Sequence, residues 1–393
     1  MKILHCSDIH LGKRPFGSRE FSQKRYLDFF NVFNELIDKA IEEKIDIFIV
    51  AGDLFDKKEL TSDVLKRCEK SFEKLKENGI KAFIIEGNHD NINNDVINSW
   101  TNYLEEKQLL VRGDYKVENG EYSFEKYRVN DVNIYGVGYP GFAVDTVLEK
   151  LSDILNPEEK NIVVVHTALG GGEFLPGLVN SETIKKLEDK VIYIAGGHLH
   201  SYQVYPKNNP YFFIPGSLEY WNVLNERSDN KGAIIFDSDS LTHKFINVNP
   251  RKRIKSNFYV ENMENLTEEF RCFCSGLNLT GEELVIVNVF LKDNGYVDVG
   301  HLEKILEDAK ALKGYIELRY QQNQNTSSEE DGYYSVQEIE KNIIESWNLF
   351  GDSENIVEYL QKFKEMQDEK DKEEDFFTLF DKMLEEEIKI EDK

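Results

Sequence analysis

This sequence lacks the features of a membrane or secreted protein. None of its apolar runs approaches the ~20 residues that a helix needs to span a bilayer. The first residues, MKILHCSDIH, form a short strand-like run and not a signal peptide. We therefore expect a cytoplasmic protein with no membrane association.

Cysteine is scarce as well. Of the four cysteines, Cys6 and Cys68 stand alone, and Cys272 and Cys274 form a single C-x-C pair. This spacing excludes a disulfide framework. A metal site at the C-x-C pair would need further ligands nearby, and none is evident, so we expect packing or surface thiols.

Positive charge is in deficit, because 48 Lys and Arg residues face 73 Asp and Glu residues and the formal net charge is −25. The stretch 364–393 accounts for part of the excess, with 13 acidic and 6 basic residues. Nucleic-acid backbones are held mainly by Lys and Arg, so the chain as a whole does not attract DNA. Two local basic clusters are either phosphate contacts or ordinary solvated faces: Lys13, Arg14, Arg19, Lys24 and Arg25, and Arg251, Lys252, Arg253 and Lys255.

Apolar runs that predict strands alternate with helical patterns in the first part of the chain. Helices are expected at 21–43 and 62–78, and strands at 3–6, 45–51, 82–86, 132–139, 161–166, 191–195, 211–215, 233–237 and 243–248. Continuous β-branched runs indicate strands that are buried on both faces. The pattern predicts a layered α/β domain over 1–250, and its last strands, which have no helices between them, predict a mixed sheet.

The remainder divides into a small domain, a linker and a tail. After the basic segment NPRKRIK at 249–255, a strand–helix–strand–helix–strand pattern predicts a small α+β domain over 256–322. A polar stretch predicts a linker over 323–334. The tail, 335–393, begins with a capping box of Ser335 and Glu338 and has apolar residues at helical spacing. Its apolar faces either pack within the chain or dock on a partner.

Polar motifs follow five of the predicted strands. Because the carboxyl ends of strands in layered α/β folds converge on one crevice, these motifs can meet in space. They contain five of the eight histidines, together with carboxylates and one amide, a mixture that suits divalent cations. The motifs are Asp8-x-His10, Gly52-Asp53-x-x-Asp56, Gly87-Asn88-His89-Asp90, the isolated His166, and Gly197-His198-x-His200.

The motifs predict a dinuclear metal site. Two cations about 3.5–4 Å apart need an anionic bridge, and Asp53 is the candidate because a carboxylate can bind one ion through each oxygen. The other predicted ligands are Asp8, His10 and His200 for one ion, and Asn88, His166 and His198 for the other. The glycines before Asp53, Asn88 and His198 are expected to allow tight turns that direct these side chains inward.

His89 is not needed as a ligand, and it stands beside Asp90. A histidine that a carboxylate orients is suited to general acid catalysis. We predict that His89 protonates the departing oxygen or stabilises the transition state, and that Asp90 holds its ring. A loop cap is the alternative for Asp90. Asp56 is expected to be either a loop carboxylate or one that supports a ligand without binding metal itself, and His5 a structural residue of the sheet.

These motifs resemble the signature blocks of the calcineurin-like metallophosphoesterases. Within that superfamily the chain is similar to the SbcD family of repair exonucleases and to its archaeal and eukaryotic "meiotic recombination eleven" relatives. The resemblance rests on LHCSDIHLG, VAGDLFD, IEGNHD, His166, GGHLH and the later PGSLE at 215–219. It implies an α/β fold with a four-layer α-β-β-α domain, a small capping domain that helps to select the DNA, and a C-terminal helical tail.

The resemblance also implies a function. Members of the family are manganese-dependent nucleases of DNA repair and recombination, with 3′-to-5′ exonuclease activity on double-stranded DNA and endonuclease activity on single strands. They form homodimers and bind an SMC-like ATPase of the SbcC type through C-terminal helices. In this chain the tail at 335–393 would bind the ATPase, and the dimer contact would fall on helices near 62–78 and 95–107.

Other functions are compatible with parts of the pattern. A phosphodiesterase for small molecules or cyclic nucleotides could use the same dinuclear site, although such enzymes often lack the second domain and partner helices. A protein Ser/Thr phosphatase is disfavoured, because Lys57 and Asp90 stand where that family has Arg and Glu. A non-catalytic scaffold for an ATPase is disfavoured by the complete ligand set and by His89.

Overall fold

The computed structural model describes residues 1–92, 98–170, 176–260, 262–291 and 296–320. These residues belong to one compact unit, Met1–Gln321. Within them, no helix has both the length and the apolar composition needed to cross a lipid bilayer. The predicted linker at 323–334 and the predicted helical tail at 335–393 lie outside the described residues.

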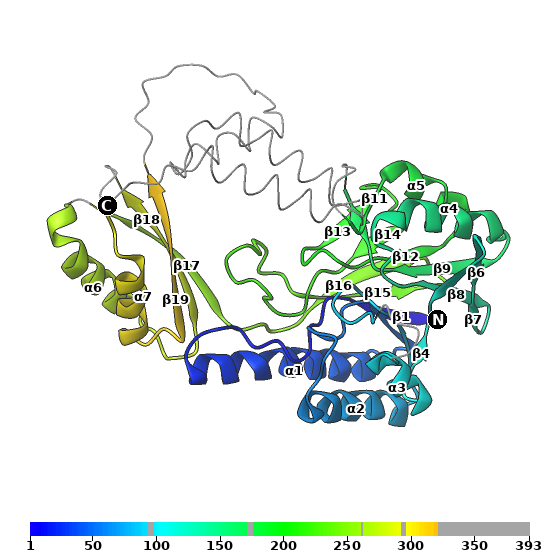
Figure 1. Ribbon diagram of the computed structural model, residues 1–393, viewed down its shortest axis with the longest axis horizontal. Helices are drawn as coiled ribbons and strands as arrows, with labels where there is room; N and C mark the ends of the chain where they lie inside the picture. Colours follow the sequence, from blue (N-terminus) through cyan, green and yellow to red (C-terminus); the bar gives the residue numbers. More distant parts are fainter. Residues whose placement is uncertain (93–97, 171–175, 261, 292–295, 321–393) are drawn as a thin grey trace, which may run out of the picture. The chain divides into compact units, whose positions relative to one another are not determined.

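The first of two six-stranded sheets is built around the N-terminal strand (Figure 1). Its strands β1 to β4 run parallel, and β15 and β16 extend the sheet antiparallel at the other edge. One face is covered by α1 (Arg19–Glu42), α2 (Ser62–Glu77) and α3 (Trp100–Glu106). The strand order is β16 (Thr242–Asn247), β15 (Gly232–Asp237), β1 (Lys2–Cys6), β2 (Ile47–Ala51), β3 (Lys81–Ile85) and β4 (Val111–Arg112).

The second sheet packs face to face against the first. Its central strands are parallel, and β7 and β13 are antiparallel edges. Its outer face is covered by α4 (Val144–Ile154) and α5 (Ser181–Lys185). The order is β13 (Gln203–Tyr205), β14 (Phe212–Ile214), β12 (Tyr193–Ala195), β9 (Lys160–Val165), β8 (Val132–Val137) and β7 (Lys126–Val129).

Short elements complete the layers. Two-stranded pairs are formed by β5 (Tyr115–Glu118) with β6 (Glu121–Phe124), and by β10 (Ala168–Leu169) with β11 (Leu178–Val179). Single 3₁₀ turns lie at Gly141–Ala143, Glu188–Lys190 and Met263–Asn265.

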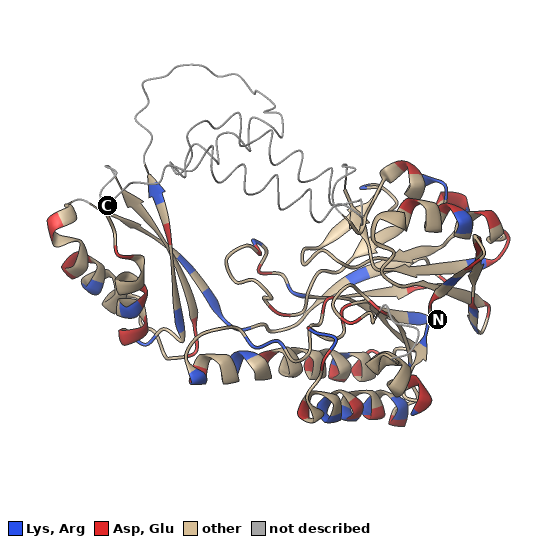
Figure 2. Cartoon of the chain, in the orientation of Figure 1, with Lys and Arg blue, Asp and Glu red and all other residues tan. Residues whose placement is uncertain are grey.

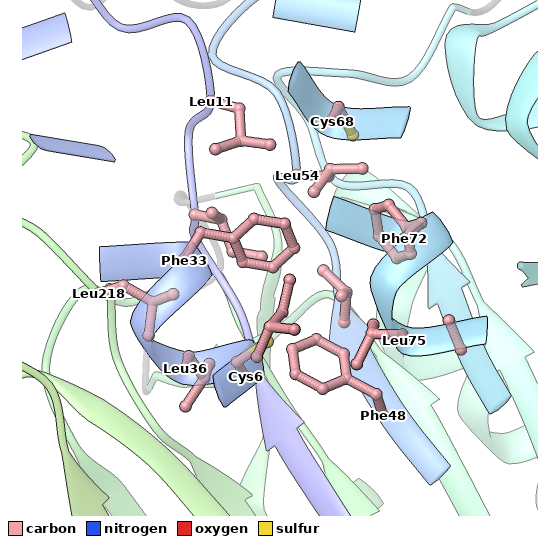
Figure 3. Packing of buried hydrophobic residues seen from close by; sticks show 14 of the residues in the cluster. Cys6, Leu11, Phe33, Leu36, Phe48, Leu54, Cys68, Phe72, Leu75 and Leu218 are labelled. Carbon is pink, nitrogen blue, oxygen red and sulfur yellow. The ribbon is translucent and has the colours of Figure 1, made fainter. Parts of the chain in front are cut away.

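The side chains of strand β2 alternate between two hydrophobic cores. Its residues Ile47 and Ile49 lie in the core between the sheets, whereas Phe48 and Val50 lie in the core beneath the helices. The ring of Phe48 contacts Phe33 of α1, with ring centroids 6.1 Å apart (Figure 3). Burial on both faces explains why the strand is a continuous apolar run. The predicted four-layer α-β-β-α architecture is confirmed.

A smaller sheet follows the layered part and has its own core within the same compact unit; this sheet and its two helices are called the small domain below, and the contacts between it and the layered part are called the joint. Strands β17 (Arg253–Tyr259), β18 (Leu284–Leu291) and β19 (Lys313–Tyr320) are parallel, and α6 (Leu266–Gly276) and α7 (Val299–Asp308) connect them. Phe270, Val287 and Leu306 are buried together in this core. The predicted strand–helix alternation is therefore present. Cys272 is exposed and Cys274 is buried, and both are free thiols, as expected.

Arginines of both basic clusters lie in the joint between the layered part and the small domain. Arg25 is fully buried, and its guanidinium lies 2.8 Å from Asp28 and 2.9 Å from Glu219. Arg251 pairs with Asp28 and with Glu282, which precedes β18. Their charge is therefore neutralised within the protein and does not form a free phosphate-binding surface. Figure 2 likewise shows basic residues interspersed with acidic ones.

Candidate metal centre

The predicted ligands lie in loops that directly follow strands of the two sheets. Asp8 and His10 follow β1, Asp53 follows β2, Asn88 follows β3, His166 follows β9, and His198 and His200 follow β12. Backbone hydrogen bonds join the first two loops, since Ile9 N donates to Asp53 O at 2.9 Å and Leu11 N donates to Leu54 O at 2.8 Å. The strands therefore deliver side chains that are distant in sequence to one place.

One group of ligand atoms comes from Asp8, His10 and His200. The Nε2 atoms of His10 and His200 lie 3.1 Å apart, and Nε2 of His200 lies 3.9 Å from Oδ1 of Asp8. Each of the three residues offers one ligand atom, and these atoms all lie within 4.8 Å of one another. The geometry suits a single cation held by one carboxylate and two imidazoles.

A second group comes from Asn88, His166 and His198. The amide oxygen of Asn88 lies 3.2 Å from His166 Nε2 and 3.1 Å from His198 Nδ1. Between the two groups lies Asp53, whose Oδ2 is 3.8 Å from His10 Nε2 and 3.4 Å from His166 Nε2. The seven side chains that the sequence singled out therefore come together, with Asp53 central to both groups.

The chemistry of these side chains fits a pair of divalent cations. Oδ2 of Asp8 is buried and has no hydrogen-bond partner, although an unpaired buried carboxylate oxygen is costly. Burial lowers the pKa of His10 well below its usual value and that of His198 to about 4, so both rings are neutral and can offer a lone pair. Burial opposes ionisation of Asp53, but the neighbouring His166 ring outweighs it and holds the carboxyl pKa below its usual range.

The backbone of the ligand loops is strained. Asp8, His10, Asp53 and His198 have φ values of 53°, 52°, 54° and 76°, in the left-handed region that residues other than glycine rarely adopt. Such strain persists only where surrounding structure enforces it, and it clusters at functional sites. The observation is independent of the ligand distances and points to the same loops.

Two glycines next to the ligands have different physical roles. Gly52 has a φ of 89°, so it supplies the turn that the sequence predicted. Gly87 has no positive φ, but a Cβ placed on it would overlap the carboxylate and the main-chain nitrogen of Asp53. The expected turn is present, since Asn91 N donates to Gly87 O at 3.1 Å, but the glycine is needed there for space and not for a positive φ.

The prediction that Asp90 holds the ring of His89 is wrong. The carboxylate of Asp90 accepts the backbone N–H of Gly87 and that of Leu54, each at 2.7 Å. It therefore ties the β2 and β3 loops together, because buried backbone donors in tight loops must find an acceptor. The ring of His89 is fixed instead by its Nδ1, which donates to the main-chain oxygen of Asp56 at 2.9 Å.

Two residues beside the site were not found from the sequence. The carboxylate of Glu226 accepts a hydrogen bond from Nδ1 of His200 at 3.0 Å. The indole of Trp221 lies 5.7 Å from the ring of His89 and donates to the carboxylate of Asp56 at 2.7 Å. Neither residue directly follows a strand, so the strand-end pattern that identified the ligands could not identify them.

The chain is similar over most of its length to archaeal proteins named DNA double-strand break repair protein Mre11. It is 28% identical to the protein from Sulfurisphaera tokodaii over 342 residues, which cover 84% of this chain and 83% of that one. It is 26% identical to the protein from Archaeoglobus fulgidus over 349 residues, 82% and 74% of the two chains.

Among solved structures, a dimetal phosphatase from Danio rerio covers 60% of this chain and 91% of its own at 9% identity. Its TM-score of 0.39 is too low to support an argument.

A family model described as calcineurin-like phosphoesterase matches residues 1–202. This range holds all seven candidate ligands and His89. The prediction of a phosphoester hydrolase, in the superfamily that includes the SbcD and Mre11 nucleases, is confirmed. Because the match spans the strands and loops that gather these side chains, the chain belongs to the calcineurin-like phosphoesterases.

Proposed function

We propose that this chain is a metal-dependent DNA nuclease that acts in double-strand-break repair. The observation that carries the proposal is the position of Asp53, whose Oδ2 lies 3.8 Å from His10 Nε2 and 3.4 Å from His166 Nε2. A carboxylate between two groups of ligands is the arrangement that a two-metal phosphoesterase needs. DNA as the substrate is supported by the Mre11 relatives, which match 84% and 82% of this chain.

In the proposed mechanism Asp53 would be shared by the two groups of residues that would hold the cations. The remaining ligands are Asp8, His10 and His200 on one side, and Asn88, His166 and His198 on the other. When bound, the cations supply Lewis-acid stabilisation of the phosphate and lower the pKa of the attacking water. His89 donates its Nδ1–H to the main-chain oxygen of Asp56, and in its imidazolium form it also carries a proton on Nε2, which it would give to the departing oxygen to become a neutral ring.

The proposal extends to metal, activities and partners. Manganese is the proposed ion, and the proposed activities are 3′-to-5′ exonuclease action on double strands and endonuclease action on single strands. The small domain would cap the DNA. An SMC-like ATPase of the SbcC type would bind 335–393, and a homodimer would form through α2 and α3. The proposed compartment is the cytoplasm.

Charge makes the isolated chain a weak DNA binder. The net charge is −25, and Arg25 and Arg251 are engaged in internal ion pairs. Phosphate contacts by Lys and Arg supply most non-specific DNA affinity. We therefore expect tight binding to DNA only in the presence of divalent metal or of the ATPase.

The direct test compares two substrates. Manganese-dependent release of nucleotides from linear duplex DNA is measured beside hydrolysis of cyclic nucleotides. The proposal expects cleavage of DNA, whereas hydrolysis of cyclic nucleotides alone would identify a small-molecule phosphodiesterase.

Replacement of His89 tests the proposed acid. His89→Gln is expected to lower turnover by about 10²–10⁴-fold, the usual contribution of a general acid, and to leave metal binding unchanged. His301→Gln is the matched control, because His301 is exposed on α7 and belongs to no site motif. Full activity in His89→Gln would remove His89 from the mechanism.

The proposed ATPase contact is tested by truncation. The full chain and a chain ending at residue 332 are each used as bait in a cell extract, and bound proteins are identified by mass spectrometry. An SMC-like ATPase retained by both chains would contradict the role proposed for 335–393.

A further inference from the structure

An arginine of the small domain is inserted into the loop that borders the metal centre. The side chain of Arg253, the first residue of β17, is 1% exposed. Its Nη1 donates to the main-chain oxygens of Val223 at 2.8 Å and Glu226 at 2.6 Å. Its guanidinium carbon lies 4.0 Å from the centre of the Tyr220 ring, and its other nitrogens bind the carboxylate of Asp229. One side chain therefore fixes most of the loop 220–229.

The same loop orients a candidate metal ligand. One carboxylate oxygen of Glu226 accepts Nδ1–H of His200 at 3.0 Å and the N–H of Asn222 at 2.8 Å. The other oxygen binds the ammonium of Lys231 and the hydroxyl of Ser217. With Nδ1 protonated and held, His200 presents Nε2 to the group of Asp8 and His10. Residues that bind the second nitrogen of a metal-ligating histidine in this way fix its tautomer and orientation.

The loop also covers this group through Trp221. The indole ring lies 5.8 Å from the ring of His10 and 5.7 Å from the ring of His200. Its Nε1 donates to Asp56, whose Oδ1 lies 3.8 Å from Nδ1 of His10. Both histidines of this group are thus in contact with residues of the loop that Arg253 holds.

The second group is supported from elsewhere. Nδ1 of His166 lies 2.8 Å from the main-chain oxygen of Ala51, the last residue of β2. Its Nε2 contacts Asn88, in the loop after β3. These supports belong to the layered part of the fold. The two halves of the centre therefore differ in what holds them.

We propose that Arg253 and Glu226 are positioning residues for the half of the metal centre formed by Asp8, His10 and His200. The small domain thereby sets the affinity of one of the two cation sites and leaves the other unaffected. The inference rests on the proposed dinuclear function. It predicts that the two sites respond differently to changes at the joint.

The test is a calorimetric titration of the metal-free full chain with MnCl₂. The wild type is expected to bind two ions. Arg253→Ala and Glu226→Ala are each expected to weaken one site by about 10–100-fold, the usual effect of losing a residue that orients a metal ligand, and to leave the other unchanged. Glu226→Gln retains an acceptor for Nδ1–H and is expected to recover part of the loss.

Arg251→Gln is the matched control. Arg251 also links the small domain to α1, but its guanidinium binds Asp28 and Glu282 and not the loop 220–229. The Arg251→Gln variant is expected to bind both cations with the same affinities as the wild type. If Arg253→Ala does not fold, Glu226→Ala and Arg253→Lys provide the same comparison.

The outcomes are distinguishable. Unchanged affinities in Glu226→Ala, or equal weakening of both sites, would overturn the inference while the proposed function stands. An equal loss in Arg251→Gln would overturn it too, because any loosening of the joint would then suffice. A wild type that binds fewer than two ions would overturn the proposed function and the inference with it.

Discussion

Two buried clusters of charged residues differ in how their charges are satisfied. At the joint with the small domain, Arg25 is matched by Asp28 at 2.8 Å and by Glu219 at 2.9 Å. At the metal centre, Oδ2 of Asp8 has no hydrogen-bond partner although the residue is fully buried. The charges of the first cluster are paired with one another, although Nε of Arg25 has no hydrogen-bond partner, whereas the second cluster has a buried carboxylate oxygen that no donor of the described residues reaches.

The backbone is strained at the metal centre and relaxed at the joint. Asp8 and Asp53 have φ values of 53° and 54°, whereas Arg25, Asp28 and Glu219 are absent from the positive-φ residues. Strain together with an unpaired buried carboxylate marks a binding site, and relaxed backbone together with paired charges marks a structural one. A charge count along the sequence cannot separate them.

Asp53→Asn is expected to have the largest effect of the four substitutions. It should lower the nuclease activity and leave the stability of the metal-free protein nearly unchanged. It removes the negative charge of the shared carboxylate, and a loss of several kcal/mol of metal-derived stabilisation corresponds to about a thousand-fold in kcat/KM. The change relieves repulsion between Asp53 and Asp8 but also removes the attraction between Asp53 and His166, so the unfolding temperature of the metal-free protein is expected to change little. A lower unfolding temperature in the absence of metal would place Asp53 in the structural class and break the comparison.

Arg25→Met is expected to show the opposite behaviour. Removing one partner of a buried ion pair leaves the other as an uncompensated buried charge. The free energy of unfolding should therefore fall by about 3–5 kcal/mol in urea denaturation. Glu219, whose side chain is fully buried, is the charge that would lose its partner. Arg67→Met is the control, since it removes an exposed pair with Asp63 and should cost about 0–1 kcal/mol. Equal costs would show that burial is not the decisive difference.

Gly87→Ala tests how tightly the metal centre is packed. The added methyl group would overlap Asp53, and overpacking of this kind costs about 1–3 kcal/mol and should also weaken metal binding. Gly276→Ala at the end of α6 meets no atom within 4 Å and serves as the control. Unfolding curves and manganese titrations of both variants provide the check. Normal metal affinity in Gly87→Ala would show that the loops can adjust.

Lys252→Gln is expected to have the smallest effect. Lys252 belongs to the same basic cluster as Arg251, but its side chain is 66% exposed and pairs with Glu283 at 3.2 Å. Glu283 is buried, but its carboxylate also accepts hydrogen bonds from Thr280, and solvent screens the exposed ammonium of Lys252, so the pair should contribute about 0–1 kcal/mol and urea denaturation should scarcely change. A loss as large as that of Arg25→Met would mean that the cluster acts as one unit.

The layers and the gathering of the ligands could be predicted because both depend on local pattern. Buried strands such as β2 read as continuous apolar runs, and a polar residue directly after such a run lies at a strand end. His166 was found in this way from the run before it. Helix α4 was missed although Val147, Leu148 and Leu151 are buried at helical spacing, so that error was avoidable.

The remaining errors concern contacts that no local pattern encodes. Asp90 stands beside His89 in sequence, yet it accepts backbone N–H groups from two loops. Glu226 reaches His200 only because the loop 220–229 folds back on the site. Arg251 and Asp28 meet across 223 residues. Hydrogen-bond partners of this kind follow from the tertiary fold and not from spacing.

The central claim is that Asp53 bridges two divalent cations, and anomalous diffraction from crystals soaked in MnCl₂ tests it most directly. We predict two manganese peaks about 3.5–4 Å apart, with the Asp53 carboxylate between them and three further ligands around each. A single peak, or two peaks that Asp53 does not bridge, would contradict the account.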